Sequence, residues 1–191
     1  MSATQASSPP DSSAGTRDRI LHVARELIQT RSYLGFSFQD IADAVGIRKA
    51  SLYHHFATKE ALGVEVMHAA TQLFKDWSGA LGGSPQDKLA AYFQMYRKAL
   101  HAGHGVCPAG AMAPGWDCIN DALRQAVREL RNEQMLWLAG VMGALRSKQA
   151  ATISPAVVFA TCQGGLLAAR MTGQPADFDE AISHLKGPLL G

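Results

Sequence analysis

Residues 37–56 read Ser-Phe-Gln-Asp-Ile-Ala-Asp-Ala-Val-Gly-Ile-Arg-Lys-Ala-Ser-Leu-Tyr-His-His-Phe, and this stretch decides the fold. Ser37 and Asp40 have the spacing of a capping box, in which two side chains together close the N-terminus of a helix. Gly46 follows the first apolar set and is placed to end that helix in a left-handed conformation. A second apolar set begins only a few residues later, at Leu52, so the stretch predicts two short helices joined by a tight turn.

The second of these helices would begin with a basic turn. In a helix-turn-helix that binds DNA, this helix projects outward and enters the major groove with its first residues. Arg and Lys side chains there donate hydrogen bonds to guanine edges. The residues in this position are Arg48, Lys49, Ala50 and Ser51.

Helical periodicity continues on both sides of this motif. The apolar stripe between Ile20 and Ile28 predicts a helix with Thr16 as its N-cap. Thr58 is placed to cap a longer helix that ends near Gly82-Gly83 and bridges two domains. We therefore expect a disordered leader over residues 1–15, a helix-turn-helix DNA-binding domain over 16–60, and a ligand-sensing and dimerisation domain over 61–191.

The rest of the chain predicts only helices, because no window alternates as a half-buried strand does. Ser84-Pro85 marks a helix start, and the segment 103–115, rich in Gly, Ala and Pro, predicts a short irregular helix. Further helices are expected near 119–145 and 154–171, and a last one, capped by Asp177 with Glu180, near 177–185. The predicted fold class is all-α, with about nine helices and no internal repeat.

Composition narrows the class of protein. The 191 residues are 47% hydrophobic, which suits one small and one larger domain, and the formal net charge of +2 decides little about partners. The leader lacks the features of a signal peptide, and no stretch supplies the about 18 apolar residues of a membrane span. The three cysteines form no CxxC pair, which indicates a reducing compartment. We therefore expect a cytoplasmic protein with no membrane partner.

The stretch from Phe36 to Leu62 resembles the TetR family of transcriptional regulators. That family has a small hydroxyl residue before the first helix of the motif, an Ile-Ala pair within it, a Gly turn, and a Leu-Tyr-x-x-Phe ending followed by Lys-Glu. The corresponding residues here are Ser37, Ile41-Ala42, Gly46, Leu52-Tyr53-His54-His55-Phe56 and Lys59-Glu60. The family often has Ser-Lys-Gly-Thr where this chain has residues 48–51, so the operator sequence stays open.

The resemblance implies roles for individual residues in binding double-stranded operator DNA. Arg48, Lys49, Ala50 and Ser51 correspond to base readers, whereas Ser37, Tyr53, His54 and Lys59 correspond to phosphate contacts. Tyr53 has the alternative of core packing, and His55 that of a solvated surface residue.

The sensor half resembles the family only weakly. Bulky side chains on the three helices after residue 84 offer a lining for a small-molecule pocket, and ordinary core packing is the alternative for about half of them. The candidate pocket residues are Tyr92, Phe93, Tyr96, Cys107, Met112, Trp116, Met135, Trp137 and Leu138.

Cys107 has more chemical character than the other pocket candidates. Its surroundings resemble the Gly-Cys stretch of some TetR-type regulators that respond to electrophiles or oxidants, although Pro108 and Trp116 depart from that pattern. A place at the start of the irregular helix would favour the thiolate; the alternative is an inert cysteine. A metal site of His101, His104, Cys107 and Cys118 matches no template, so we expect no metal and no cofactor. A cysteine-dependent enzyme lacks a signature for an oriented base, so we expect no enzyme.

A homodimer is expected, because one short recognition helix buries too little surface for tight specific binding. The resemblance places the interface on the last two helices, near 154–173 and 177–186. The candidate interface residues are Phe159, Gln163, Gly164, Leu167 and Met171. The pair Gly164-Gly165 would allow close approach of the helices, or would only relieve crowding within one chain.

The function implied by the resemblance is a repressor that a small-molecule effector releases from its operator. The effector would shift the helix that begins after Thr58 and so change the spacing of the two DNA-binding domains. Activation instead of repression stays open. The rival interpretation, a helical module that binds another protein, predicts no enclosed pocket.

Overall fold

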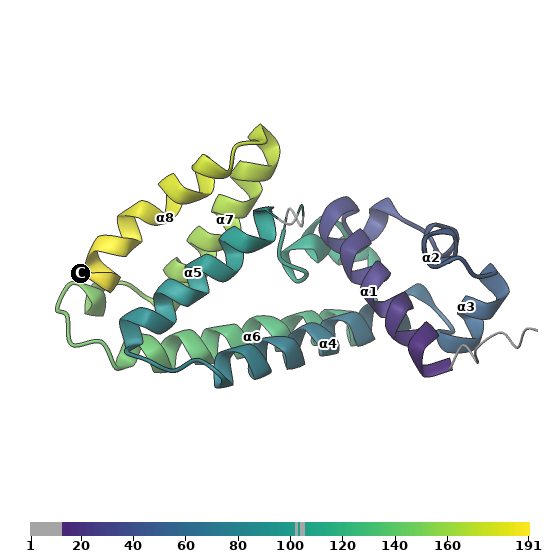
Figure 1. Ribbon diagram of the computed structural model, residues 1–191, viewed down its shortest axis with the longest axis horizontal. Helices are drawn as coiled ribbons and strands as arrows, with labels where there is room; N and C mark the ends of the chain where they lie inside the picture. Colours follow the sequence, from purple (N-terminus) through teal and green to yellow (C-terminus); the bar gives the residue numbers. More distant parts are fainter. Residues whose placement is uncertain (1–12, 102, 104–105) are drawn as a thin grey trace, which may run out of the picture.

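The computed structural model describes residues 13–101, 103 and 106–191, and it confirms the all-α fold (Figure 1). Within that part of the chain there is no strand, and the elements in order are α1 (Ser13–Arg31), η1 (Tyr33–Gly35), α2 (Phe38–Val45), α3 (Lys49–His55), α4 (Lys59–Gly79), α5 (Pro85–His101), η2 (Gly110–Cys118), α6 (Asp121–Gly143), η3 (Ala150–Thr152), α7 (Pro155–Thr172) and α8 (Pro175–Leu190). Helices α1 to α3 form one end of the molecule, and the C-terminus lies at the other.

The helix-turn-helix is built as its sequence predicts. The Ser37 hydroxyl accepts a hydrogen bond from the Asp40 backbone N–H, and the Asp40 carboxylate accepts one from the Ser37 N–H at 2.7 Å, which completes the capping box. Gly46 adopts φ 77° and its N–H donates to the Ala42 carbonyl at 2.9 Å. This left-handed residue ends α2 and allows α3 to begin after Arg48.

The hydrophobic core consists of two clusters. The first unites buried residues of α1, α2 and α3 with Leu62, Val66 and Met67 of α4 and with buried residues of η2 and α6. The second unites Phe74 of α4 with buried residues of α5, α6, α7 and α8. The core around the helix-turn-helix therefore does not stop at residue 60, where the sequence predicts a domain boundary.

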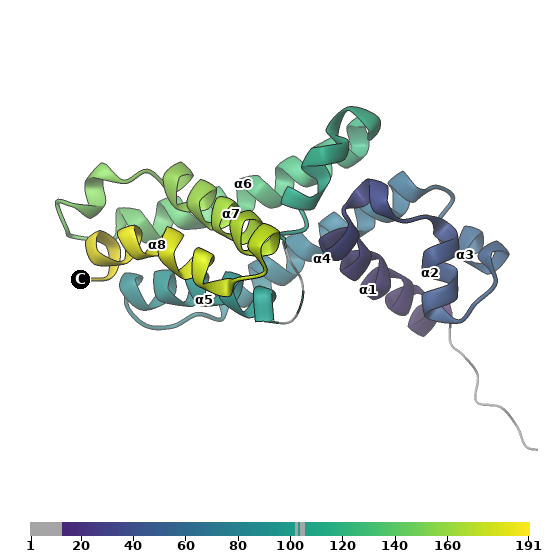
Figure 2. The same ribbon diagram turned by 90° about the horizontal axis from the view of Figure 1, so that it is seen from above.

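The larger end is a helical stack. Helix α4 packs along α6, and α8 packs against both α7 and α5, which also contact each other. Figure 2 shows α7 and α8 side by side on the face turned toward the viewer. None of the helices in the described residues is both long and apolar enough to span a membrane.

Three predicted helix ends differ from the structure. Helix α1 begins at Ser13, so residues 13–15 are helical and Thr16 is a buried residue inside the helix instead of its N-cap; residues 1–12 lie outside the described part. Helix α4 ends at Gly79, before the predicted glycine pair. Helix α8 begins at Pro175 and is not capped by Asp177, whose carboxylate accepts a hydrogen bond from the Thr172 hydroxyl at 2.6 Å.

We expect Gly46→Ala to lower the free energy of unfolding by about 1–2 kcal/mol, because a side chain disfavours the left-handed conformation. Gly140→Ala is the matched control: Gly140 is exposed in α6 and no heavy atom lies within 4 Å of an added Cβ. Better helix propensity should raise stability by up to about 1 kcal/mol there. Urea unfolding followed by circular dichroism measures both, and equal effects of the two changes would contradict the left-handed turn.

Candidate nucleic-acid interface and effector cavity

The first turn of α3 is free to meet another molecule. Arg48, Lys49 and Ala50 are exposed, and Ser51 is half-buried. Among the described residues, neither Arg48 nor Lys49 takes part in an ion pair. Leu52, fully buried, anchors the helix to the core behind them. The structure therefore brings the four predicted base readers together on the outer surface.

Tyr53 and His54 lie on the exposed side of the same helix. Tyr53 is 51% exposed, and its ring contacts Phe38 of α2 with 5.1 Å between ring centroids. One face of the tyrosine ring packs against Phe38 while about half of the residue is exposed, so the side chain can reach another molecule. His54 is exposed and His55 half-buried.

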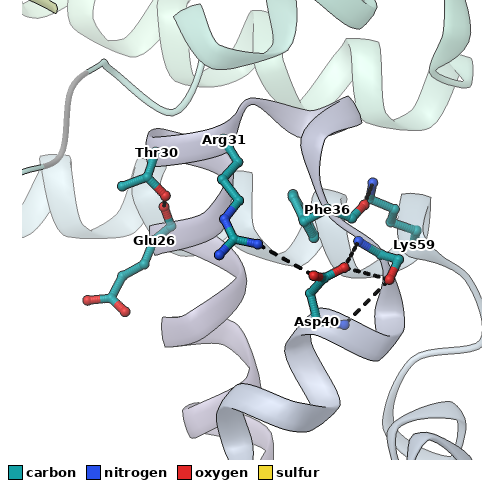
Figure 3. A network of polar contacts seen from close by, with 7 residues as sticks. Glu26, Thr30, Arg31, Phe36, Asp40 and Lys59 are labelled. Carbon is teal, nitrogen blue, oxygen red and sulfur yellow. Dashed lines mark hydrogen bonds and ion pairs between the residues drawn. The ribbon is translucent and has the colours of Figure 1, made fainter.

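The predicted phosphate contact Ser37 belongs to a polar network at the start of α2 (Figure 3). Its hydroxyl donates to the Asp40 carboxylate at 2.6 Å, and Arg31 of α1 pairs with the same carboxylate at 3.4 Å. The hydrogen bonds from Ser37, with a smaller contribution from Arg31, lower the pKa of Asp40. The Ser37 side chain is exposed, but its proton is already committed to this network.

Lys59 does not have the free ammonium that a phosphate contact needs, and this part of the sequence prediction is corrected. Its Nζ donates hydrogen bonds to the carbonyls of Tyr33 and Phe36 and lies 4.5 and 4.1 Å from the centroids of their rings. Partial burial lowers the pKa of Lys59. The side chain instead ties the first turn of α4 to the loop that precedes α2 (Figure 3).

A cavity of about 340 Å³ lies where the two ends of the molecule meet. Its wall is mostly apolar and comes from α1, α4, α5, α6, α7 and the segment before η2. The lining residues are Arg25, Gln29, Ala70, Leu73, Phe74, Trp77, Met95, Tyr96, Ala99, Val106, Cys107, Pro108, Leu130, Gln134 and Leu166. Tyr96 and Cys107 are the predicted pocket residues among them.

The other predicted pocket residues do not line this cavity. Met112 is fully buried in the first core cluster, and Trp116 packs at its edge with Arg128 over its ring. Phe93 and Leu138 are buried in the second cluster, and Met135 is half-buried on α6. Trp137 and Tyr92 stand behind the wall: their rings stack 5.5 Å apart, and Trp137 lies 5.8 Å from Trp77. Their large size makes these side chains candidates for a pocket lining, but most of them pack in the core or against neighbouring helices.

A polar cluster that the sequence analysis missed lies at the α5–α6 side of the cavity. Gln134, 3% exposed, accepts hydrogen bonds from the hydroxyls of Tyr92 at 3.1 Å and Tyr96 at 2.9 Å. Gln163 of α7 donates to the Tyr96 hydroxyl at 3.1 Å. Burial raises the pKa of both tyrosines, so they stay neutral donors. The feature of the sequence that could have revealed this cluster is Gln134, a polar residue on the otherwise apolar stripe of α6.

Cys107 lies at the cavity but outside any helix. It is half-buried, whereas Cys118 is exposed and Cys162 is buried, which raises the pKa of the Cys162 thiol to about 12. The 3₁₀-helix η2 begins only at Gly110, so the predicted help from a helix start is absent at Cys107. His104 lies outside the described residues, and the described part contains no group of three or more potential metal ligands.

The predicted dimer face is partly free. Leu167 is 51% and Met171 75% exposed, and Gly164 is exposed beside them. Phe159 is half-buried with Arg131 over its ring at 5.7 Å. The sequence predicts Gln163 on this face, but its amide is turned inward and donates a hydrogen bond to the Tyr96 hydroxyl. Gly165 faces α8: a Cβ there would lie 2.9 Å from the Phe178 ring, so this glycine permits packing within the chain.

Three polar contacts join α1 to the larger end. Arg170 of α7 donates to the carbonyls of Gln29 and Thr30 in the last turn of α1. The Gln29 amide donates to the Val106 carbonyl at 3.2 Å, and the Ser32 hydroxyl to the Ala111 carbonyl at 3.1 Å. Helix α1 is therefore held by the same segments that line the cavity.

Comparison with known proteins agrees with this architecture. Residues 20–66 match the family model described as bacterial regulatory proteins, tetR family. The HTH-type transcriptional repressor KstR2 of Mycolicibacterium smegmatis is 32% identical over 102 residues, or 50% of this chain and 48% of that protein. The HTH-type transcriptional repressor NemR of Escherichia coli is 28% identical over 83 residues, or 41% of this chain and 42% of that protein.

A solved structure extends the similarity over almost the whole chain. A TetR-family transcriptional regulator from Agrobacterium tumefaciens is 25% identical and superposes with a TM-score of 0.84, covering 93% of this chain and 99% of that one. By sequence, in contrast, the chain spans about half or less of the length of the curated relatives named above. The sequence similarity to those relatives is therefore partial, and the shared fold is nearly complete.

The inward position of Lys59 predicts a separation between stability and DNA binding. We expect Lys59→Met to lower the free energy of unfolding by about 1–3 kcal/mol, because two backbone carbonyls lose a charged donor. Lys49→Met removes an exposed, unpaired cation and should change stability by no more than about 0.5 kcal/mol. Urea unfolding of both variants measures the difference. A stable Lys59→Met variant would mean that Lys59 is free, as the sequence predicted.

Proposed function

Because the chain belongs to the TetR family of transcriptional regulators, we propose that it binds operator DNA as a homodimer and that a small molecule in the cavity controls this binding. The observation that carries the proposal is the exposed basic turn at Arg48 and Lys49, whose cations have no ion-pair partner among the described residues. The family consists of regulators, which argues against the enzyme alternative. A DNA-binding role places the protein in the cytoplasm.

In the proposed complex, α3 enters the major groove. Arg48 and Lys49 reach base edges, while Ala50 and Ser51 leave room for close approach. Tyr53 and His54, exposed on the same helix, contact the phosphates and fix the register. Ser37 contacts phosphate only by accepting a hydrogen bond through an ordered water or by giving up its bond to Asp40. Lys59 is left out of the contact set and acts by holding the loop before α2.

Two copies are needed because α3 has only 7 residues and offers a small contact surface. The two recognition helices would lie about 34–36 Å apart, or a multiple of that, on one side of the DNA. We place the dimer interface on the exposed face of α7 with α8. Gly164 and Leu167 lie one turn apart there, Met171 continues the stripe, and Val157 precedes it with 47% exposure.

Control by a small molecule follows from the position of the cavity. A ligand there would contact Arg25 and Gln29 of α1 and a face of α4 that includes Phe74 and Trp77. Movement of α4 would reach the helix-turn-helix through Lys59, and movement of α1 would reach it directly. A ligand changes DNA binding only if it prefers one of the two arrangements. The relatives named above are repressors, so we propose that the ligand releases the protein from DNA.

The size and lining of the cavity support a small molecule as the controlling partner. The space is partly open to solvent, has the several hundred cubic ångströms of a small-molecule site, and is lined by residues of five helices. A second candidate trigger is covalent modification of Cys107 by an electrophile or oxidant, because that sulfur lines the same cavity.

The proposed operator binding predicts that Lys49→Ala weakens the complex by about 1–3 kcal/mol if Lys49 reads a base. The operator is first selected from a random DNA pool, and affinities are then measured by fluorescence anisotropy at several salt concentrations. Lys148→Ala removes the same charge from an exposed site at the far end of the molecule and is the control. Equal affinities of the two variants at every salt concentration would remove Lys49 from the interface.

The cysteine candidate predicts that N-ethylmaleimide lowers operator affinity of the wild-type protein and of Cys118→Ser, but not of Cys107→Ser. Cys118 is the more exposed of the two thiols, so it controls for modification that has no access to the cavity. Mass spectrometry confirms the site of alkylation. Full operator affinity of a protein alkylated at Cys107 would reject the cysteine trigger and leave the ligand mechanism in place.

A further inference from the structure

Arg25 differs from every other arginine of α1. Arg17 pairs with Glu65 at 3.1 Å, Arg19 donates to the Val45 carbonyl, and Arg31 pairs with Asp40. Arg25 has no ion pair or hydrogen bond among the described residues, and its Nε is buried without a partner. The side chain nevertheless lines the cavity. A cation that the fold leaves without a partner therefore stands in the wall of the cavity.

The surroundings of Arg25 do not neutralise its charge. No Asp or Glu lines the cavity, and most of the wall is hydrocarbon or aromatic surface, with Leu73, Phe74, Trp77, Met95, Leu130 and Leu166 as its largest apolar members. A guanidinium stays protonated in proteins, so it cannot escape the cost of burial by losing its charge. Arg25 is half-buried and its Nε is shielded from solvent without a partner, so a bound anion would supply the hydrogen-bond acceptor that this nitrogen lacks.

The second unused group on the wall is also a donor. The Gln134 carbonyl oxygen is occupied by Tyr92 and Tyr96, whereas no hydrogen bond is made by its Nε2 within the described residues. A carboxylate accepts hydrogen bonds and donates none, and its two oxygens match the planar fork of a guanidinium. Two unused hydrogen-bond donors in an otherwise apolar cavity thus favour a ligand that combines a carboxylate with an apolar part.

We propose that the cavity binds an amphipathic organic carboxylate, whose carboxylate pairs with Arg25 and whose apolar part packs against Phe74 and Trp77. The proposal rests on the proposed function and names the chemical class of its effector. A small inorganic anion would pair with Arg25 but leave the apolar wall uncovered. A neutral amphiphile would cover the wall but leave the guanidinium unpaired.

The position of Arg25 also gives the ligand a route to the DNA-binding end. Arg25 is one turn before Gln29, whose carbonyl accepts a hydrogen bond from Arg170 and whose amide holds Val106. A carboxylate on Arg25 would therefore join α1 to the helices of the larger end at a point next to the existing contacts. The ligand's carboxylate would bind α1 through Arg25, and its apolar part would pack against α4 through Phe74 and Trp77.

The test compares acids with alcohols of the same shape on the full-length protein. Octanoate is compared with octan-1-ol, and naphthalene-2-carboxylate with naphthalene-2-methanol, by isothermal titration calorimetry and by the fluorescence of Trp77. We expect each acid to bind at least roughly tenfold more tightly than its alcohol, since hydrogen bonds to charged groups exceed neutral ones. Arg25→Met should abolish this preference without lowering the melting temperature of the ligand-free protein.

Arg128→Met is the matched control, because Arg128 stacks on Trp116 outside the cavity and its loss should leave the preference for acids unchanged. Four results would overturn the proposal: equal affinity for acid and alcohol, a preference that survives Arg25→Met, binding of neither up to the solubility limit, or displacement of the acids by equimolar inorganic phosphate. Operator binding is measured separately on the wild-type protein. If DNA binds but acids are not preferred, only this inference fails; if acids are preferred but DNA does not bind, only the proposed function fails.

Discussion

The paired helices α4 and α6 both contribute buried side chains to the two hydrophobic cores, and the coupling of the molecule depends on this, above all on α4, which leads directly from the helix-turn-helix. Its first half places Leu62, Val66 and Met67 in the core of the DNA-binding end, and its second half places Phe74 in the core of the larger end. Close-packed cores do not deform continuously, because loss of contact at any side chain costs free energy. A displacement of the second half of α4 would therefore be carried to the first half, and the proposed ligand beside Phe74 would act on both ends.

Cations satisfy backbone carbonyls within the helix-turn-helix end and at its junction with the larger end. Lys59 binds the carbonyls before α2, Arg19 binds the carbonyl at the end of α2, and Arg170 binds those at the end of α1. Carbonyls at a helix C-terminus lack partners within the helix and carry partial negative charge, so a cation there stabilises the arrangement. These contacts hold the helix-turn-helix in one orientation, whereas Arg25 of the same helix α1 binds no carbonyl within the described residues and lines the cavity instead.

The sequence predicts the parts of the structure that local chemistry determines. The capping box at Ser37, the left-handed Gly46 and the free basic turn at Lys49 depend on neighbours within a few residues, so pattern alone could find them. Lys59 and Arg25 could not be assigned in this way, because both act through elements distant in the chain. The same holds for the pocket: bulky residues could be recognised, but whether Phe93 or Trp137 faces a cavity or a neighbouring helix depends on packing among helices whose order in space the pattern does not give.

The cavity and the recognition helix are linked through the shared helix α1, which gives a physical reason for their placement. A ligand-binding space buried wholly inside the larger end could affect the helix-turn-helix only through the helices that both cores share, α4 and α6. Here the wall includes α1 itself, and α1 packs against α2. Because the contacts of Gln29, Ser32 and Arg170 already fix one orientation of α1, a ligand that fits best when α1 is displaced must compete with four hydrogen bonds. A neutral hydrogen bond contributes about 1 kcal/mol and one from a charged group about 1.5–3 kcal/mol, so together these contacts are worth several kcal/mol. Only the difference between the ligand's affinities for the two arrangements acts against them, so an effector must prefer the displaced arrangement by a comparable free energy in order to reposition α1.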